Sequence, residues 1–287
     1  MKPVRHALTV DVEDWFQVLN LRPKIPRESW ETQDLRMEAP TRRLLDLFDE
    51  HGAKATFFCL GWIAERVPGL VEEILARGHE LASHGYDHKL LPELGHEGFR
   101  LDLQKTNRIL QSISGGLPVE SFRACTWSVG PETPWAFPTL VEEGFRYDSS
   151  VQPVRNADYA GADAQLGPHW LEPLPDRPLF ELPPLVGQLL GRRLALGGGG
   201  YLRLLPVSWI SRGLRNREKE GQPSCLYLHP WELDPDQPRV GAKGLSAFRH
   251  YVNLDKTERK LDTLLANHSF TTLKDVALDF AQQVSPG

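Results

Sequence analysis

Residues 54–88 read KATFFCLGWIAERVPGLVEEILARGHELASHGYDH, and this stretch decides the fold. The apolar run Lys54–Leu60 predicts a buried strand, and Ala64–Arg77 has the spacing of a helix that Gly78 ends. His79–Ser83 returns to strand character and leads into two histidines four positions apart. A strand, a helix and a second strand in this order predict a parallel βαβ unit with polar side chains at the carboxyl ends of its strands.

The same alternation continues on both sides of this stretch. Further strands are predicted at Ala7–Val10, Glu120–Arg123, Phe145–Asp148 and Ser224–Leu228, and further helices at Thr41–His51, Phe99–Ser114, Pro134–Glu143 and Leu254–Ala266. Less regular parts are a surface excursion at 20–40, a Pro- and Ala-rich stretch at 150–178, two short strands around a glycine run at Leu194–Leu205, and a strand with a short helix at Phe270–Phe280. The pattern predicts one α/β domain over 1–287.

Composition excludes several classes of protein. The 287 residues include 33 basic and 38 acidic side chains, and no basic stripe indicates a nucleic-acid partner. No stretch reaches the roughly 18 apolar residues of a membrane span. The three cysteines form no CxxC pair and favour reduced thiols. The apolar run at the N-terminus is too short for a signal peptide, so we expect a cytoplasmic protein.

Four clusters of polar residues follow predicted strands: Asp11-Val12-Glu13-Asp14-Trp15, His84-Gly85-Tyr86-Asp87-His88, Phe122-Arg123-Ala124-Cys125 and Leu226-Tyr227-Leu228-His229-Pro230-Trp231. Carboxylates that repel one another at a barrel mouth attract a cation, and histidines four apart can share a metal. An arginine can pair with such a carboxylate, and a histidine titrates near neutral pH as a general acid must. Taken alone, the first cluster also fits a solvated acidic turn, Arg123 fits an ordinary surface arginine, and His229 fits a partly buried histidine. The two histidines at 84 and 88 are by themselves a weak sign of a metal. The combination of the four clusters favours a metal site.

These motifs resemble the polysaccharide deacetylase family, which has the NodB-homology fold and is carbohydrate esterase family 4. The resemblance rests on KATFFCLG at 54–61, GHELASHGYDH at 78–88, FRA at 122–124, YDSS at 147–150 and LH at 228–229. It implies a distorted (β/α) barrel of about seven parallel strands over a core at 7–231, with an additional hairpin and a C-terminal extension at 232–287. It also implies a metal-dependent hydrolase that removes N-acetyl groups from an N-acetylated carbohydrate or a precursor of one.

The resemblance assigns roles by position. Asp11 matches the general base, Arg123 the arginine that orients it, and His229 the general acid. His84 and His88 match ligands of one divalent metal ion, for which zinc is expected before cobalt, nickel or manganese. Asp148 matches the acidic residue of the YDSS motif and is expected to belong to the catalytic set.

The third protein ligand is ambiguous, because Val12 stands where the family carries a ligating aspartate. Strand alternation places Glu13 on the same side as Asp11, whereas Asp14 matches the family by residue type. We favour Asp14, with Glu13 as the alternative. A second departure is Cys125, which replaces the usual proline and puts a thiol near the metal, where it could be reactive.

Candidate sugar-stacking residues are Trp15, Trp127, Tyr201 and Trp231, with core packing as the alternative for each. The run Gly197–Gly200 lacks the features of a phosphate loop and fits a tight hairpin or a close backbone approach. Residues 197–201 together with 249–255 resemble deacetylases associated with exopolysaccharide synthesis. The competing interpretations are a ring-opening amidohydrolase of the allantoinase-like branch and an inactive sugar-binding relative. An oligomer is compatible with the sequence.

Overall fold

The computed structural model describes residues 3–154, 164–189, 191–241 and 244–284. The strands are β1 (His6–Val12), β2 (Thr56–Cys59), β3 (Glu80–Ser83), β4 (Ser121–Phe122), β5 (Tyr147–Asp148), β6 (His169–Leu174), β7 (Arg177–Glu181), β8 (Val186–Leu189), β9 (Arg192–Ala195), β10 (Cys225–Leu228) and β11 (Phe270–Thr271). The helices are α1 (Glu38–Glu50), α2 (Gly61–Arg66), α3 (Pro68–Ala76), α4 (Leu91–Ile113), α5 (Ala136–Glu142), α6 (Gly199–Leu204), α7 (Val207–Lys219), α8 (Gly244–Tyr251), α9 (Thr257–Leu265) and α10 (Leu273–Val284).

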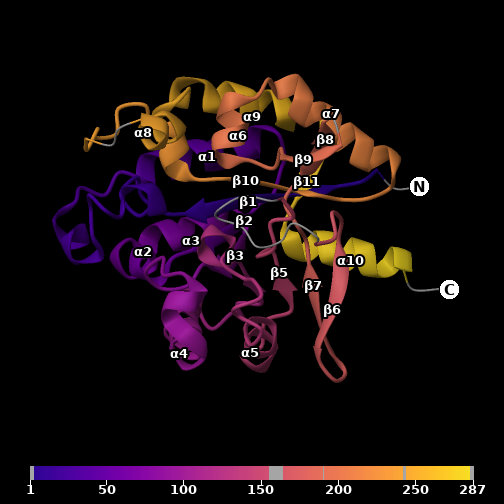
Figure 1. Ribbon diagram of the computed structural model, residues 1–287, viewed down its shortest axis with the longest axis horizontal. Coiled ribbons are helices and arrows are strands. Elements are labelled where there is room, and N and C mark those ends of the chain that lie inside the picture. The colour runs from indigo at the N-terminus through magenta and orange to yellow at the C-terminus, as the bar shows by residue number, and fades with distance from the viewer. Residues whose placement is uncertain (1–2, 155–163, 190, 242–243, 285–287) are drawn as a thin grey trace.

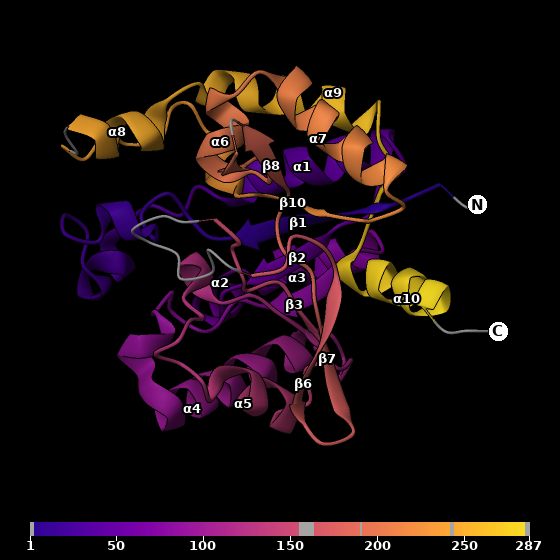
Figure 2. The ribbon, with the colours of Figure 1, turned by 45° about the vertical axis from the view of Figure 1, so that its right-hand side comes forward.

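The main sheet has the strand order β10-β1-β2-β3-β4-β5-β7-β6, with β11 beside β1. All its neighbours are parallel except the hairpin β6–β7. Beyond β7 the chain returns to β10, where Pro184 bridges Cys225 and the Leu185 amide donates to the Cys225 carbonyl at 2.9 Å. The sheet therefore curls into a distorted barrel (Figures 1 and 2), as the sequence predicted.

Strand alternation separates two faces of the barrel wall. On β1, Leu8, Val10 and Val12 belong to the large core between the sheet and its covering helices. Ala7 belongs instead to a second cluster with Phe58 of β2 and residues of four further strands, packed on the apolar face of α10. Helix α10 thus closes the end of the barrel where the strands begin (Figure 1), and the site lies at the opposite end.

Several elements differ from the sequence-based prediction. The helix predicted at Ala64–Arg77 is two helices, because Pro68 has no amide hydrogen and starts α3 after Val67 leaves the helical conformation. The helix predicted at Phe99–Ser114 begins at Leu91, with a break at Gly95. The second strand predicted within Leu194–Leu205 is wrong, because residues after Gly198 form α6.

The stretch predicted as irregular at 150–178 contains β6 and the start of the hairpin with β7, and its residues 155–163 lie outside the described part. The excursion at 20–40 holds short 3₁₀ turns at Leu19–Leu21 and Arg27–Thr32. Helices α7 and α8 were not predicted. Within the described ranges, no helix combines the length and the apolar character needed to cross a membrane.

Candidate metal-binding active site

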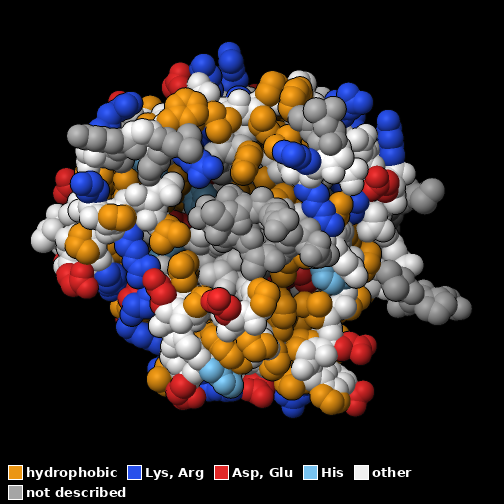
Figure 3. Space-filling model, in the orientation of Figure 1, with side chains coloured by type: hydrophobic (Ala, Val, Ile, Leu, Met, Phe, Trp, Pro, Cys, Tyr) orange, Lys and Arg blue, Asp and Glu red, His pale blue; other side chains and the backbone are white. Residues whose placement is uncertain are grey.

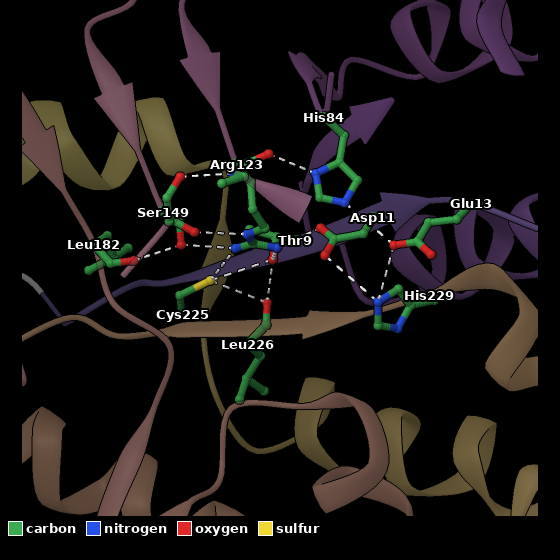
Figure 4. A network of polar contacts seen from close by, with 12 residues as sticks. Thr9, Asp11, Glu13, His84, Arg123, Ser149, Leu182, Cys225, Leu226 and His229 are labelled. Atoms are coloured by element: carbon green, nitrogen blue, oxygen red, sulfur yellow. Dashed lines mark hydrogen bonds and ion pairs between the residues drawn. The ribbon is translucent and has the colours of Figure 1, made fainter. Parts of the chain in front are cut away.

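The acidic cluster sits where β1 ends inside the barrel mouth. Alternation along β1 points Asp11 inward, and Glu13, two residues later, follows in the same direction. Figure 4 shows both carboxylates beside His84 and His229, which come from the ends of β3 and β10. All four side chains are largely shielded from solvent. The three strands therefore bring two carboxylates and two histidines to one point.

Glu13 and two histidines form a compact set of possible metal ligands. The Glu13 Oε1 atom lies 3.4 Å from Nε2 of His84 and 3.4 Å from Nε2 of His88. Burial works against the charge of Glu13, but His88 and His229 more than compensate and hold the pKa of its carboxyl well below the usual value. An ionised carboxylate and two imidazoles make a donor set that suits a divalent transition metal.

The hydrogen bonding of His84 supports a ligand role for its outer nitrogen. Its Nδ1 atom lies 2.8 Å from the Arg123 carbonyl, which can only accept a hydrogen bond, so the proton is on Nδ1 and the Nε2 lone pair is free. That buried Nε2 atom has no hydrogen-bond partner in the described part of the chain. A buried lone pair aimed at a carboxylate and a second imidazole fits a metal ion.

Asp14, the residue that the sequence favoured as third ligand, does not face the histidines. Its carboxylate accepts hydrogen bonds from the backbone amides of Trp15 (2.8 Å), Arg36 (2.7 Å) and Met37 (3.1 Å). Burial raises its pKa to about 6 despite these amides. The preference for Asp14 is therefore not what the structure supports: Asp14 ties the end of β1 to the 34–37 segment, and Glu13 faces the histidines.

Arg123 and Asp11 form a buried ion pair in the barrel interior (Figure 4). Arg123 Nη1 lies 2.6 Å from Asp11 Oδ1 and also donates to Thr9 Oγ1 at 2.8 Å. The other guanidinium nitrogens donate to the carbonyl and hydroxyl of Ser149, and the plane lies over the Phe58 ring. With every donor direction engaged, Arg123 neutralises one Asp11 oxygen and leaves Oδ2 facing His229 at 3.8 Å.

His229 has a carboxylate partner that the sequence analysis missed. Its Nδ1 atom lies 2.6 Å from Oε1 of Glu232, whose other oxygen accepts from Arg203 Nε at 2.7 Å. Burial would lower the pKa of His229, but the carboxylates of Glu13, Glu232 and Asp11 raise it overall. The available signal was the spacing His229-Pro-Trp-Glu232, which forms a capping box at the 3₁₀ turn Pro230–Leu233.

Asp148 is connected through Ser150 to the backbone next to Arg123. Its carboxylate accepts from the hydroxyl and amide of Ser150, whose hydroxyl in turn accepts from the Ala124 amide. Burial raises the pKa of both Asp148 and the adjacent Glu181, and Glu181 holds the proton of this pair. In the described part of the chain, no hydrogen bond or ion pair joins Asp148 to Asp11 or His229. The structure therefore places it as a positioning residue and not in contact with the reacting groups.

A cavity of about 290 Å³ opens at the site. Its lining includes Trp127, Tyr201 and Trp231 but not Trp15, which is buried and packs edge-on against Phe16. Trp15 is therefore a core residue, and the other three stay candidates for contact with a sugar.

Backbone strain is concentrated at the same cavity. Five described residues other than glycine have a left-handed backbone, and three of them line it: His88 (φ 56°), Thr126 (φ 55°) and Trp127 (φ 50°). Such strain persists where the surrounding structure holds it, which is typical of functional sites.

Cys125 does lie beside the histidines. Its sulfur and one ring nitrogen each of His84 and His88 are mutually within 4.8 Å, and the thiol donates to the His84 carbonyl at 3.0 Å. Burial raises the pKa of this thiol, which favours the protonated and unreactive form.

Two family models match the chain. Residues 26–134 match the polysaccharide deacetylase model, and residues 149–278 match a domain of unknown function, DUF3473. Both matched regions contribute strands to the one curled sheet. The predicted division into a core at 7–231 and an extension at 232–287 stays a prediction.

Individual relatives are similar over shorter stretches. A peptidoglycan-N-acetylglucosamine deacetylase of Bacillus cereus is 37% identical over 78 residues, which is 27% of this chain and 28% of that protein. A Mycobacterium smegmatis structure assigned to the polysaccharide deacetylases aligns with a TM-score of 0.63 at 20% identity, over 100% of this chain and 96% of that one. Puue allantoinase aligns with a TM-score of 0.63 at 18% identity, over 99% and 92%. At these identities the two structures indicate the fold alone.

Proposed function

We propose that the chain is a member of the polysaccharide deacetylase family and hydrolyses the N-acetyl group of an N-acetylated carbohydrate, because residues 26–134 match the polysaccharide deacetylase model and residues 149–278 match DUF3473. One observation carries the proposal. Glu13 Oε1 lies 3.4 Å from Nε2 of both His84 and His88, while His229 Nε2 lies 3.6 Å from the same oxygen and 3.8 Å from Asp11. A ligand set, a base and an acid thus surround one point at the cavity.

Glu13, His84 and His88 would hold the divalent ion. When bound, such an ion polarises the acetyl carbonyl and makes a water molecule acidic enough to attack at neutral pH. Zinc is our first expectation because two imidazoles and one carboxylate are a common zinc donor set. The identity of the metal is part of the proposal.

The remaining residues move protons. Asp11 Oδ2, which Arg123 leaves free, accepts the proton of the attacking water. His229 Nε2 then donates a proton to the departing nitrogen, because an amine is expelled far more readily than its anion. Glu232 holds the ring in the orientation that presents Nε2 to the cavity.

Metal analysis with turnover tests this proposal. His84→Ala and His88→Ala should each lose the bound metal and the deacetylation of N-acetylglucosamine oligomers while keeping the fold by circular dichroism. His96→Ala is the matched control, because that exposed histidine on α4 stacks on Trp135 and is not among the cavity lining. Full metal content and turnover in either site variant would refute the ligand assignment.

The main competing activity is hydrolytic opening of a small cyclic amide, as in an allantoinase. The fold does not separate the two, since an allantoinase structure and an assigned deacetylase structure align equally well. Parallel assays with allantoin and an N-acetylglucosamine oligomer decide between them. Bound metal without turnover of either substrate would favour the third interpretation, an inactive sugar-binding relative.

The finer assignments extend the proposal. We place the substrate in exopolysaccharide synthesis because residues 197–201 and 249–255 resemble that branch. Cytoplasmic location stays a prediction, and the three cysteines, all buried and free, are compatible with it.

A further inference from the structure

One wall of the cavity is built by α6 and the end of α8, in the DUF3473 region. The His250 ring is buried and stacks on Trp231 at 4.6 Å and 15°, and Trp231 stacks on His229 at 5.2 Å and 24°. Arg203 of α6 donates to the His250 carbonyl at 2.6 Å. The backbone at 249–250 is therefore fixed to the proposed general acid through a stack of three rings.

Arg249 is presented from this wall and lines the cavity. Its side chain is exposed, and the described residues offer its guanidinium no hydrogen bond or ion pair. The other arginine in the lining, Arg203, is buried and paired with Glu232, and Arg123 behind the site is paired with Asp11. Figure 3 shows the hollowed face, with Lys and Arg side chains near the hollow. Arg249 thus contributes an uncompensated positive charge at the mouth.

A neutral glycan has no group that needs this charge. A guanidinium matches the two oxygens of a carboxylate or phosphate through parallel hydrogen bonds. The cavity of about 290 Å³ is at the lower end of the range for small-molecule sites, so it accommodates a short segment of glycan. An oxyanion close to the reacting sugar would then reach Arg249.

We propose that the substrate carries an oxyanion, a phosphate or a carboxylate, next to the N-acetylated sugar, and that Arg249 binds it. The inference rests on the proposed function for the reacting sugar. The two sources of the oxyanion are a diphosphate-linked sugar and a glycan that contains a uronic acid. Both present oxygens that a guanidinium binds in the same way, so the experiment contains one arm for each source.

The test compares three N-acetylglucosamine ligands on the metal-loaded protein. They are a neutral oligomer, the sugar joined to a nucleoside diphosphate, and an oligosaccharide that alternates the sugar with a uronic acid. Dissociation constants come from calorimetry, and kcat/KM is measured separately. The variants are Arg249→Gln, Arg249→Lys and, as matched control, Arg212→Gln, which removes an exposed charge from α7 outside the cavity lining.

The wild type should prefer one oxyanion ligand over the neutral oligomer by about tenfold, about the worth of one charged hydrogen-bonded contact. Arg249→Gln should abolish that preference, Arg249→Lys should keep part of it, and Arg212→Gln should keep all of it. The preference should also shrink as ionic strength rises. The arm that shows the preference identifies the source of the oxyanion.

Two results overturn the inference: equal affinity of the wild type for all three ligands, or a preference that survives Arg249→Gln. Equal loss in Arg212→Gln also counts against it, because the effect would then be general charge attraction. Absence of turnover on every ligand would defeat the proposed function instead, and the dissociation constants would still decide the role of Arg249.

Discussion

His229 Nδ1 lies 2.6 Å from Glu232 Oε1, and this contact fixes which ring nitrogen faces the cavity. Because the carboxylate accepts the Nδ1 proton, the Nε2 atom is the one that exchanges protons with the substrate. Glu232 is in turn held by Arg203, and all three residues lie in the DUF3473 region, which therefore supplies both the proposed acid and the two buried charges behind it. This contact makes Glu232 a positioning residue, and its removal should change both the turnover and its dependence on pH.

Glu232→Gln should lower kcat by roughly 10²-fold, the lower end of the contribution of a positioned acid. Glu232 raises the pKa of His229, so its loss should also move the basic limb of the pH–rate profile to lower pH. The single variant leaves Arg203 buried without a counter-charge and should lose stability. The double variant Arg203→Met/Glu232→Gln also removes the Arg203 charge, so it should regain stability. Its basic limb should stay at the lower pH, because Glu232 is still absent. If the double variant regained both the stability and the wild-type position of the basic limb, Glu232 would have only a structural role.

Substitution of the two neighbouring acids should separate ligand from scaffold. We expect Glu13→Gln to lose stoichiometric metal, because it removes the charged oxygen that faces both histidines. Asp14→Asn should keep the metal and lose about 1–3 kcal/mol of unfolding free energy, because three backbone amides lose part of their acceptor. Metal content by mass spectrometry and thermal unfolding measure the two effects. The opposite pattern would restore Asp14 as the ligand.

Protons should compete with the metal. In the metal-free protein, burial works to lower the pKa of His88, but the negative charge of Glu13 beside it acts in the opposite direction, and the pKa is raised to about 8. Below that pH, His88 must lose a proton before it can bind a metal, so apparent metal affinity should fall by roughly tenfold per pH unit as pH decreases below 8. Titration calorimetry in two buffers of different ionisation enthalpy counts the released protons. A metal affinity that stays constant between pH 6 and about 8 would contradict His88 as a ligand.

Asp11→Asn should retain the metal and lose roughly 10²- to 10⁴-fold in turnover, because an amide cannot accept the proton from water. Thr9→Val is the matched control: it removes another acceptor of Arg123 but leaves the carboxylate. Its loss of turnover should be small by comparison. If Asp11→Asn emptied the metal site, Asp11 would have to be counted among the ligands.

The barrel and most of the site could be predicted because their signals are local. Apolar runs mark β1, β2, β3 and β10, polar residues follow all of these strands except β2, and the period of two along β1 already placed Glu13 beside Asp11. The preference for Asp14 followed residue type over that geometry, whereas in the structure Asp14 accepts hydrogen bonds from backbone amides and Glu13 faces the histidines.

The DUF3473 region was harder to predict because its determinants are distant contacts. Strand β6 alternates only between exposed and half-buried positions, and its partner β7 continues the barrel beside β5. At Gly198, a side chain would put its Cβ 1.7 Å from the Tyr227 carbonyl oxygen. That approach to β10 explains the glycine run, and the following residues then turn into α6 instead of a second strand.

The acid role of His229 has the sharpest test. Because the pKa of His229 is raised, its protonated form persists to higher pH than that of a free imidazole and is lost as pH rises, so His229 should produce the basic limb of a bell-shaped profile. His229→Ala should remove that limb and slow amide substrates by roughly 10²- to 10⁴-fold. An activated acetyl ester should suffer much less, because its leaving group departs without a proton. Equal losses on the amide and the ester, with the basic limb unchanged, would leave His229 only its packing against Trp231.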